Sequence, residues 1–424
     1  MKKTVVFIVE RYYPNYSAVG VCVGNIIQEL TSKYNIIVIT KKQFNDEKII
    51  EYNNHYISTY STKDNNIRNY IDKKLKVTRG YKKIFYVFLK NIVRGLGYLG
   101  AILKNENIKN QDVVVIYKRL EDIQGNIDAI IPTCLPIESI IASINYKNNA
   151  SRHTKIIPLL FDKFSKNSTL HRTEMNKIKK FSKHLLIEKT IIEQCDKLIF
   201  VDAWREHVNR YFSVYKSKFF QIEHPLIKNI NAVDYVQYDP KKINIVYTGA
   251  LYRKIRSPLK ALDFFENLIK KDNRITMHFY VTGDCDYIIQ DYSRRYPQNI
   301  IYYGQVKSDI AKSAIINADI LFSIGNTDVT QLPSKIFEYI STGNPVIHFY
   351  SKKEDPVIEI LKRYKSSICV WNEDECIENI EAKVLEIANN PGSKIQFDEI
   401  KDIYKAAIPK YTADIIIDLI DIDI

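Results

Sequence analysis

Short apolar runs alternate along the chain with amphipathic stretches and with loops rich in turn-forming residues. In the first half, this pattern predicts strands at residues 4–9, 36–40, 113–117, 129–132, 155–161 and 197–201, and helices at 24–34, 136–144 and 173–194. The run at 4–9 is apolar throughout, as is typical of a strand that helices cover on both faces. The alternation predicts an α/β fold with a parallel sheet.

A second alternating block follows residues 238–242, which we interpret as a linker. Its predicted strands are 243–248, 276–282, 300–303, 319–324 and 345–349, and its predicted helices are 259–270 and 333–342. Four of these strands run directly into a glycine, at Gly249, Gly283, Gly304 and Gly325. In doubly wound sheets, ligands bind at the carboxyl ends of strands, where glycine lets the backbone come close.

The size and composition fit two packed domains. The chain has 424 residues, of which 46% are hydrophobic and 26% charged, and this length is typical of two domains of roughly 200 residues. We predict two Rossmann-like domains that face a cleft, the first at 1–236 and the second from 237 onward. The first apolar run is too short for a signal peptide or a membrane span, so we expect a cytoplasmic protein.

The chain lacks the cysteine and metal-site patterns that would point to other classes of protein. Its cysteines are scattered without a C-x-x-C pair, so neither a disulfide framework nor a zinc site is predicted. Asp284-Cys285-Asp286 resembles a D-x-D metal motif, but we interpret it as a helix cap. Gly95, Gly97 and Gly100 match the dinucleotide fingerprint G-x-G-x-x-G, but they lie in an amphipathic segment and we interpret them as part of a helix.

The net charge of +13 is concentrated in one segment. Between Lys63 and Lys109 there are twelve basic and three acidic residues, interleaved with aromatic and aliphatic ones. One interpretation is a solvated basic helical face. Another is attraction to anionic lipid headgroups, worth about 1 kcal/mol per basic residue near the surface. No nucleic-acid fold signature accompanies the charge, so we predict no nucleic-acid partner.

Two stretches of the second half contain residues that suit an activated sugar donor. Breaking the bond to a nucleotide diphosphate requires its developing negative charge to be stabilised. Arg253, Lys254 and Arg256 follow the predicted strand end at Gly249 and form a candidate diphosphate clamp, the alternative being a solvated loop.

The second stretch is a predicted helix start. Pro333 suits the first turn of a helix, so that the N–H groups of Ser334 and Lys335 could face a phosphate or sugar hydroxyls. Glu338 lies one turn further on the same side and can accept two hydrogen bonds from the ribose diol.

The run from Pro333-Ser334-Lys335 through Glu338 to the Gly-x-Pro-Val-Ile segment at 343–347 is similar to the donor-binding signature of GT-B-fold glycosyltransferases. It resembles especially family 4 and the relatives that make bacterial surface polysaccharides. The opening strand with the loop that ends at Gly20, the segment 196–201, and the loop Gly304-Gln305-Val306 also look like parts of this family.

The resemblance implies a function for each part of the chain. Glu338 would hold the ribose, Arg253 or Arg256 the diphosphate, and Lys335 with the backbone at Ser334 the phosphate or donor sugar. Gly20, Gly249, Gly304 and Val306 would complete the donor site, and residues 237–400 would form the donor domain. The helix in 401–424 would pack back on the acceptor-binding first domain. No metal or cofactor is implied, and retention of anomeric configuration is favoured.

The sequence also departs from the family pattern. The family often has a second glutamate eight positions before Glu338, where this chain has Thr330, and an arginine where it has Ala250. Asp328 could take the place of the missing glutamate. Asp162 is the candidate catalytic acid on the acceptor side, the alternative being a cap or a structural ion pair.

Three functions follow as hypotheses. The first is a glycosyltransferase that uses a nucleotide diphosphate sugar and a glycan or lipid-linked acceptor, located in the cytoplasm or at the inner membrane face. The second is a GT-B-type nucleotide-sugar epimerase, which would convert the donor without an acceptor. The third is a non-catalytic partner subunit, which would bind no nucleotide sugar.

Overall fold

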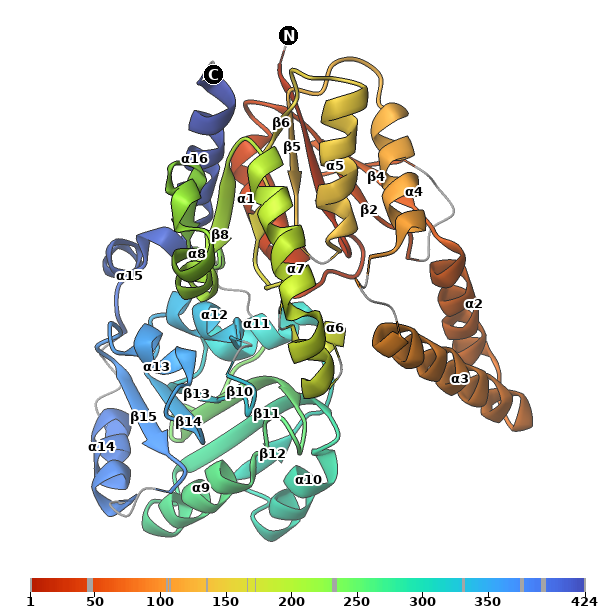
Figure 1. Ribbon diagram of the computed structural model, residues 1–424. Coiled ribbons are helices and arrows are strands. Elements are labelled where there is room, and N and C mark those ends of the chain that lie inside the picture. The colour runs from red at the N-terminus through yellow and green to blue at the C-terminus, as the bar shows by residue number, and fades with distance from the viewer. Residues whose placement is uncertain are drawn as a thin grey trace. The chain divides into compact units, whose positions relative to one another are not determined.

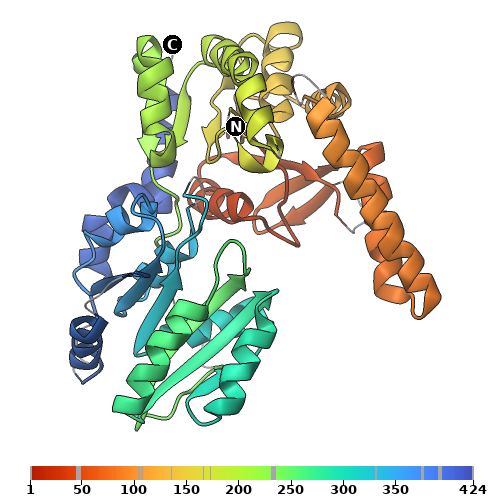
Figure 2. The ribbon, with the colours of Figure 1, turned by 60° about the horizontal axis from the view of Figure 1, so that its bottom comes forward.

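The computed structural model describes residues 2–43, 49–103, 106, 108–134, 136–165, 167–171, 173–230, 235–329, 332–373, 377–389 and 394–422. The chain divides into two compact units. One extends to Pro225 and also includes the segment from Pro409 onward, and the other extends from Leu226 to Ile408. Each unit is built around a parallel sheet (Figures 1 and 2).

The main sheet of the first unit has six strands in the order β3-β4-β2-β1-β5-β6. They are β1 (Thr4–Val9), β2 (Asn35–Lys41), β3 (Ile49–Tyr52), β4 (His55–Tyr60), β5 (Ala129–Pro132) and β6 (Lys155–Ile156). All pairs are parallel except β3 with β4. The central strand β1 is buried from Val5 to Val9, which confirms the strand predicted from its unbroken apolar run.

The helices of the first unit include the following elements: α1 (Ala18–Leu30), α2 (Lys63–Val77), α3 (Tyr81–Leu103), α4 (Asn110–Glu121), α5 (Glu138–Asn149), α6 (Ser168–His171), α7 (Glu174–Gln194), α8 (Arg205–Tyr211) and α16 (Pro409–Asp421). The strand predicted at 113–117 is wrong, because these residues lie in α4. Val113, Ile116 and Leu120 are buried there at helical spacing, so one face of α4 packs inward despite the β-branched sequence.

The strand predicted at 155–161 is also incorrect in detail. It consists of two short strands in different sheets, β6 and β7 (Leu159–Leu160), and β7 belongs to a second parallel sheet with β8 (Leu198–Val201) and β9 (Phe219–Ile222). Pro158 separates the two. Since proline lacks an N–H, it cannot donate to a ladder, although its carbonyl accepts from Ile199 at 2.9 Å.

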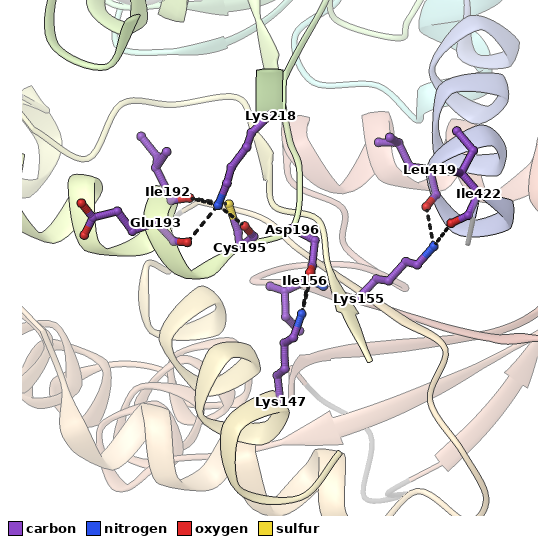
Figure 3. A network of polar contacts seen from close by, with 10 residues as sticks. All are labelled: Lys147, Lys155, Ile156, Ile192, Glu193, Cys195, Asp196, Lys218, Leu419 and Ile422. Atoms are coloured by element: carbon purple, nitrogen blue, oxygen red, sulfur yellow. Dashed lines mark hydrogen bonds and ion pairs between the residues drawn. The ribbon is translucent and has the colours of Figure 1, made fainter. Parts of the chain in front are cut away.

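The C-terminal helix α16 packs on the first unit, as predicted. It lies beside α1, and Asp421 near its end forms ion pairs with Lys3 and Lys33. Lys155 donates hydrogen bonds to the carbonyls of Leu419, at 3.1 Å, and Ile422 (Figure 3). It also donates to the carbonyl of Ile420 at 3.2 Å. Because the last carbonyls of a helix lack partners within it, a lysine here both satisfies and neutralises them.

Lysines also secure the end of α7 and the start of β8. Lys218 donates to the carbonyls of Ile192, Glu193 and Cys195 at 2.7–2.9 Å (Figure 3). Lys147 of α5 is paired with Asp196, whose carboxylate also accepts from the backbone N–H of Ile156 at 2.7 Å. The pairing ties α5, β6 and the start of β8 together.

The basic segment folds into two helices, α2 and α3, that pack on each other. The G-x-G-x-x-G residues Gly95, Gly97 and Gly100 lie within α3, as predicted. Of the residues of α3, all of which the structure describes, none is buried. Among the helices described, none is long and apolar enough to cross a membrane.

The second unit contains one parallel sheet in the order β12-β11-β10-β13-β14-β15. The strands are β10 (Ile243–Leu251), β11 (Ile275–Gly283), β12 (Ile300–Tyr302), β13 (Ile320–Ile324), β14 (Val346–Tyr350) and β15 (Ser367–Trp371). The helices are α9 (Leu259–Lys271), α10 (Asp286–Arg295), α11 (Ser308–Ile316), α12 (Lys335–Ser341), α13 (Pro356–Leu361), α14 (Ile377–Asn389) and α15 (Phe397–Ile403).

Renumbered within the unit, the strand order is 3-2-1-4-5-6, which is the order of dinucleotide-binding Rossmann folds. Alternate residues of the central strands, including Ile245, Met277 and Phe322, pack with Phe265 of α9 and Ile289 of α10 in one apolar cluster. The predicted doubly wound architecture is therefore confirmed for this unit.

Of the strands predicted to end at a glycine, β10 continues past its glycine, whereas β11 ends at its own. β10 runs past Gly249 to Leu251, and β11 includes Gly283, which is paired with Leu251. Gly283 has φ +127°, and a Cβ atom there would lie 1.9 Å from the carbonyl oxygen of Leu251. A side chain is excluded at this position both by the backbone conformation and by the close approach of β10.

We predict that Gly283→Ala destabilises the second unit by at least about 2 kcal/mol, because it adds backbone strain and a steric clash. Differential scanning calorimetry should show a melting temperature lower by several degrees. The control is Gly95→Ala, since a Cβ atom at this position in α3 meets nothing within 4 Å. That variant should melt at the same or a slightly higher temperature, since alanine favours helix. Equal melting of the two variants would contradict the prediction.

Candidate functional site

The second unit has a narrow pocket at the carboxyl ends of β10 and β13. These strands pair only at Ile245 with Ile320 and at Val246 with Leu321, and then separate. The pocket that opens beyond this point is lined by Tyr247, Thr248, Arg256, Ser323, Ile324, Pro333, Lys335, Ile336, Tyr339 and Val357. It lies where the strand order of the sheet reverses, which is where ligands bind in open α/β sheets.

Tyr339 of α12 hydrogen-bonds to the backbone of β10 beside the pocket. Its hydroxyl accepts a hydrogen bond from the N–H of Thr248 at 2.8 Å and donates to the carbonyl of Thr248 at 3.2 Å. The side chain is almost completely buried. The hydroxyl therefore supplies the hydrogen bonds that a neighbouring strand would make to Thr248, at the point where β13 no longer pairs with β10.

Arg256 is fixed with its guanidinium group at the pocket. Its Nε and Nη2 atoms donate to Asn326 Oδ1 at 3.1 and 2.7 Å. The loop that contains Arg256 is itself held against the loop after β13, because the N–H of Thr327 donates to the carbonyl of Ile255 at 2.9 Å. The two loops at the strand ends thus position one cation.

Arg253, the alternative diphosphate ligand, lies elsewhere. Its guanidinium group donates to the hydroxyl of Tyr287 on α10 at 3.1 Å and is exposed. Its backbone N–H donates to Asp284 Oδ1 at 2.7 Å. The cap predicted for the Asp284-Cys285-Asp286 motif is therefore incorrect in detail, since Cys285 is the N-cap of α10 and makes no side-chain cap hydrogen bond.

The residues of the Pro-Ser-Lys segment lie together at the start of α12. Pro333 and Lys335 line the pocket, and Lys335 Nζ lies 2.7 Å from Glu338 Oε2. Both charged side chains are about one-third exposed. The prediction that Pro333 lies in the first helical turn is wrong, because Ser334 is the N-cap and the helix begins at Lys335. The cause is a tight turn, in which the N–H of Ile336 bonds to the carbonyl of Pro333.

The pocket carries net positive charge. Burial raises the pKa of Tyr247 and of Tyr339 to about 12, so both phenols stay neutral. Arg256 and Lys335 therefore face no phenolate anion there. Outside the pocket, burial lowers the pKa of Lys228, an effect that Lys312 strengthens and Glu338 opposes. Lys228 is thus a further cation in the electrostatic surroundings of Glu338.

The remaining predicted donor residues lie at several places. Gly249, with φ +137°, follows Thr248 on β10. Gly304 is buried after β12, and Val306 is half-buried in the turn before α11. Gly20 lies in the first unit, in the first turn of α1 instead of in the predicted loop, and its N–H donates to Ser17 Oγ at 3.0 Å.

Asp162 also belongs to the first unit, two residues after the end of β7. Its side chain reaches solvent, but the protein atoms around it desolvate the carboxylate and raise its pKa. Asp328, the substitute considered for the missing glutamate, lies in the loop after β13. Thr330, where that glutamate would stand, is outside the described residues.

Sequence reasoning missed four polar residues that line the pocket: Tyr247, Thr248, Ser323 and Tyr339. Three of them lie near the carboxyl ends of β10 and β13. A prediction of the strand order would have identified these ends as the switch point, but the order depends on pairings between distant segments. Within the described residues, no group of three or more His, Cys, Asp or Glu side chains could hold a metal ion.

No protein-family model matches the sequence, and no curated protein matches it. Solved structures do match. Sucrose-phosphate synthase from Thermosynechococcus elongatus has a TM-score of 0.59 at 11% identity, with 99% of each chain covered. A TarM variant from S. aureus has a TM-score of 0.57 at 12% identity, with 99% of this chain and all of that chain covered. The α,α-trehalose 6-phosphate synthase from Burkholderia multivorans has a TM-score of 0.58 at 11% identity, with 99% and 96% covered.

The fold is GT-B. These similarities extend over nearly the whole chain, so both units and the returning C-terminal helix belong to the same architecture. At such low sequence identity, the comparison establishes the fold alone. The chemistry of the site has to be argued from the residues of the pocket.

We predict that Tyr339→Phe destabilises the second unit by about 1–3 kcal/mol, because it leaves the buried N–H and carbonyl of Thr248 without their partner. The control is Tyr287→Phe, which removes an exposed hydroxyl bonded to Arg253 and should leave the melting temperature unchanged. Calorimetric melting of both variants tests this. A Tyr339→Phe variant as stable as the wild type would show that the hydroxyl does not hold β10 and α12 together.

Proposed function

We propose that the protein is a glycosyltransferase that moves a sugar from a nucleotide diphosphate sugar, bound in the second unit, to a glycan or lipid-linked acceptor. The observation that carries this proposal is the pocket at the switch point of the sheet, where Arg256 and Lys335 face a space flanked by neutral tyrosines. A diphosphate has the charge and hydrogen-bonding capacity that this arrangement complements.

In this proposal, the two cations act on the departing diphosphate. As the bond between the anomeric carbon and the phosphate oxygen breaks, negative charge grows on that oxygen, and Arg256 and Lys335 stabilise it. Asn326 holds the guanidinium group in place before the ligand arrives, so little reorganisation is needed.

Glu338 would bind the ribose. Its carboxylate is about one-third exposed and ion-paired with Lys335 through Oε2, so it can accept hydrogen bonds from vicinal hydroxyls while remaining charged. The pair would place the ribose contact next to the phosphate contact, since the two charged groups lie 2.7 Å apart. Asp162 remains the candidate catalytic acid of the first unit.

The solved structures support the proposal through their own described functions. The S. aureus TarM variant is described in complex with UDP, fondaparinux and α-GlcNAc-glycerol, and two of the other matches are sugar-phosphate synthases. We further propose a cytoplasmic enzyme of surface-polysaccharide synthesis that acts without a metal ion and with retention of configuration, as the family resemblance implies.

We predict that Glu338→Ala weakens the binding of the preferred nucleotide sugar by at least about tenfold, because charged hydrogen bonds to the ribose are lost. Isothermal titration calorimetry should be run with a panel that includes UDP-glucose, UDP-N-acetylglucosamine and GDP-mannose. The variant should remain folded, since a partly exposed ion pair contributes little to stability.

The matched control is Glu359→Ala. Glu359 forms the same type of i,i+3 ion pair, with Lys362, on an exposed face of α13, and its loss should leave binding unchanged. Normal donor binding by Glu338→Ala would contradict the assignment of the ribose contact. Conversion of the donor by the wild type without any acceptor would favour the epimerase over the transferase.

We also propose that α3 contacts an anionic membrane. Seven of its apolar residues form one stripe at helical spacing, and all seven are exposed: Ile84, Phe85, Phe88, Ile92, Leu96, Leu99 and Leu103. On an ideal helix, Lys83, Lys90 and Arg94 lie on the opposite side, and Lys82 lies beside the stripe. A helix with one apolar and one basic face lies in the interface of a membrane, with its apolar side chains between the headgroups.

The membrane contact would bring the enzyme to a lipid-linked acceptor, and it predicts a charge-dependent affinity. Replacing Lys82, Lys83 and Arg94 by Gln should weaken binding to vesicles that contain phosphatidylglycerol, because each basic residue contributes about 1 kcal/mol at an anionic surface. Co-sedimentation with the vesicles measures this.

A charge-matched control replaces Lys179, Lys183 and Lys189 by Gln. These are exposed residues of α7 in the same unit, and the control should sediment like the wild type. Equal loss of binding in both variants would indicate only a general effect of net charge, and no binding by the wild type would exclude the membrane contact.

A further inference from the structure

Three polar side chains form a continuous chain of hydrogen bonds inside the second unit. Ser323 lies on β13 with His348 as its register partner on β14, and Asp355 is the N-cap of α13. His348 Nδ1 lies 2.7 Å from Ser323 Oγ, and His348 Nε2 lies 3.3 Å from Asp355 Oδ2. We refer to Ser323, His348 and Asp355 as the relay.

The relay joins the interior of the unit to the wall of the pocket. His348 is fully buried and Asp355 is 3% exposed, while Ser323 lines the pocket together with Arg256 and Lys335. A buried carboxylate and a buried imidazole are costly unless each is hydrogen-bonded. Of the three relay residues, Ser323 alone lines the pocket.

The backbone around Asp355 is built to hold it in place. Asp355 Oδ1 accepts from the N–H of Val357 at 2.9 Å, which directs Oδ2 toward His348. At the end of β13, Gly325 leaves the space for this carboxylate, because a Cβ atom there would lie 1.9 Å from Oδ2. The carboxylate therefore stays against the ring.

The protonation state of His348 decides the direction of the last hydrogen bond. Next to ionised Asp355, the Nε2 atom carries a proton and donates it to the carboxylate. In the neutral ring, Nδ1 accepts, so Ser323 donates inward. In the imidazolium, Nδ1–H donates to Ser323 Oγ, and the serine hydroxyl becomes free to donate into the pocket.

We propose that a diphosphate in the pocket binds together with one proton, which His348 takes up, and that Ser323 then donates a hydrogen bond to a phosphate oxygen. This inference rests on the proposed function, because it requires that the pocket holds the diphosphate of a nucleotide sugar. Ser323 would be a ligand-binding residue, and His348 and Asp355 would be positioning residues that act through it.

The charges around the relay explain why proton and ligand bind together. The charged or titratable side chains on the elements packed against it include Arg256, Lys335, Glu338, Tyr247, Tyr339, Tyr350, Glu359, Lys362 and Cys369. Burial raises the pKa of the Cys369 thiol to about 11, so this residue is neutral. Without a ligand, the pocket wall beside Ser323 has the positive charges of Arg256 and Lys335. A bound diphosphate would offset these charges and place negative charge beside Ser323, at the end of the relay, which would favour proton uptake together with the ligand.

The test is the number of protons bound with the ligand. Titration calorimetry with UDP-glucose, UDP-N-acetylglucosamine and GDP-mannose near neutral pH, in buffers of different ionisation enthalpy, measures this number. These ligands carry no phosphate group that titrates in that range. For the wild type we expect uptake of a fraction of a proton up to one, with affinity that falls as the pH rises. In His348→Gln and Asp355→Asn, the uptake should be lost.

Ser323→Ala should bind about tenfold more weakly, since it removes one hydrogen bond to a charged group. Ser341→Ala is the matched control, because this serine is also buried in the second unit but bonds only to the carbonyl of Phe337 on its own helix. It should leave both affinity and proton uptake unchanged. Calorimetric melting shows whether His348→Gln and Asp355→Asn are folded, and so separates loss of binding from loss of folding. If these two variants do not fold, Ser323→Ala tests the inference in their place.

Two outcomes separate this inference from the proposed function. If the wild type binds a nucleotide sugar without taking up a proton, or if His348→Gln takes up as many protons as the wild type, the relay does not act as proposed while the donor site stands. If the wild type binds none of the nucleotide sugars, the proposed function fails and the inference fails with it.

Discussion

The separation of β10 from β13 is the structural constraint on which the site depends. The two strands pair over two residues, and then the chain continues from β10 toward one edge of the sheet and from β13 toward the other. Their carboxyl ends therefore separate. The backbone of β10 would be left unsatisfied at Thr248 if the hydroxyl of Tyr339 did not bond to it. One buried phenol thus allows an opening in the middle of a parallel sheet and fixes α12 beside it.

The electrostatics of the second unit follow from this opening. Arg256 comes from the loop after β10 and Lys335 from the start of α12, and their neighbours Tyr247 and Tyr339 are kept neutral by burial. Positive charge is therefore concentrated in a small space that water only partly screens. The relay adds a polar connection between that space and the interior carboxylate of Asp355.

The first unit has its own use of positive charge. Lys155, Lys147 and Lys218 have structural roles. Lys155 and Lys218 bond to carbonyls at helix ends, and Lys147 is paired with Asp196. Lys82, Lys83 and Arg94 of α3 instead face solvent, outside a stripe of exposed apolar side chains. The lysines that hold α16 and α7 bond to defined carbonyl groups. The basic residues of α3 suit the diffuse anionic surface that we propose as their partner, so the same residue types have different roles in the two places.

The sequence alone determined the α/β class, most strands, and the chemical character of the Pro333–Glu338 segment, because apolar runs and helix-start residues are local signals. It misplaced 113–117, where β-branched residues masked the helical spacing of Val113 and Ile116. Only the tertiary structure decided that Arg256 and not Arg253 reaches the pocket, and that Ser323 meets His348. These outcomes depend on strand register and loop packing between residues far apart in the chain, for which no local pattern exists.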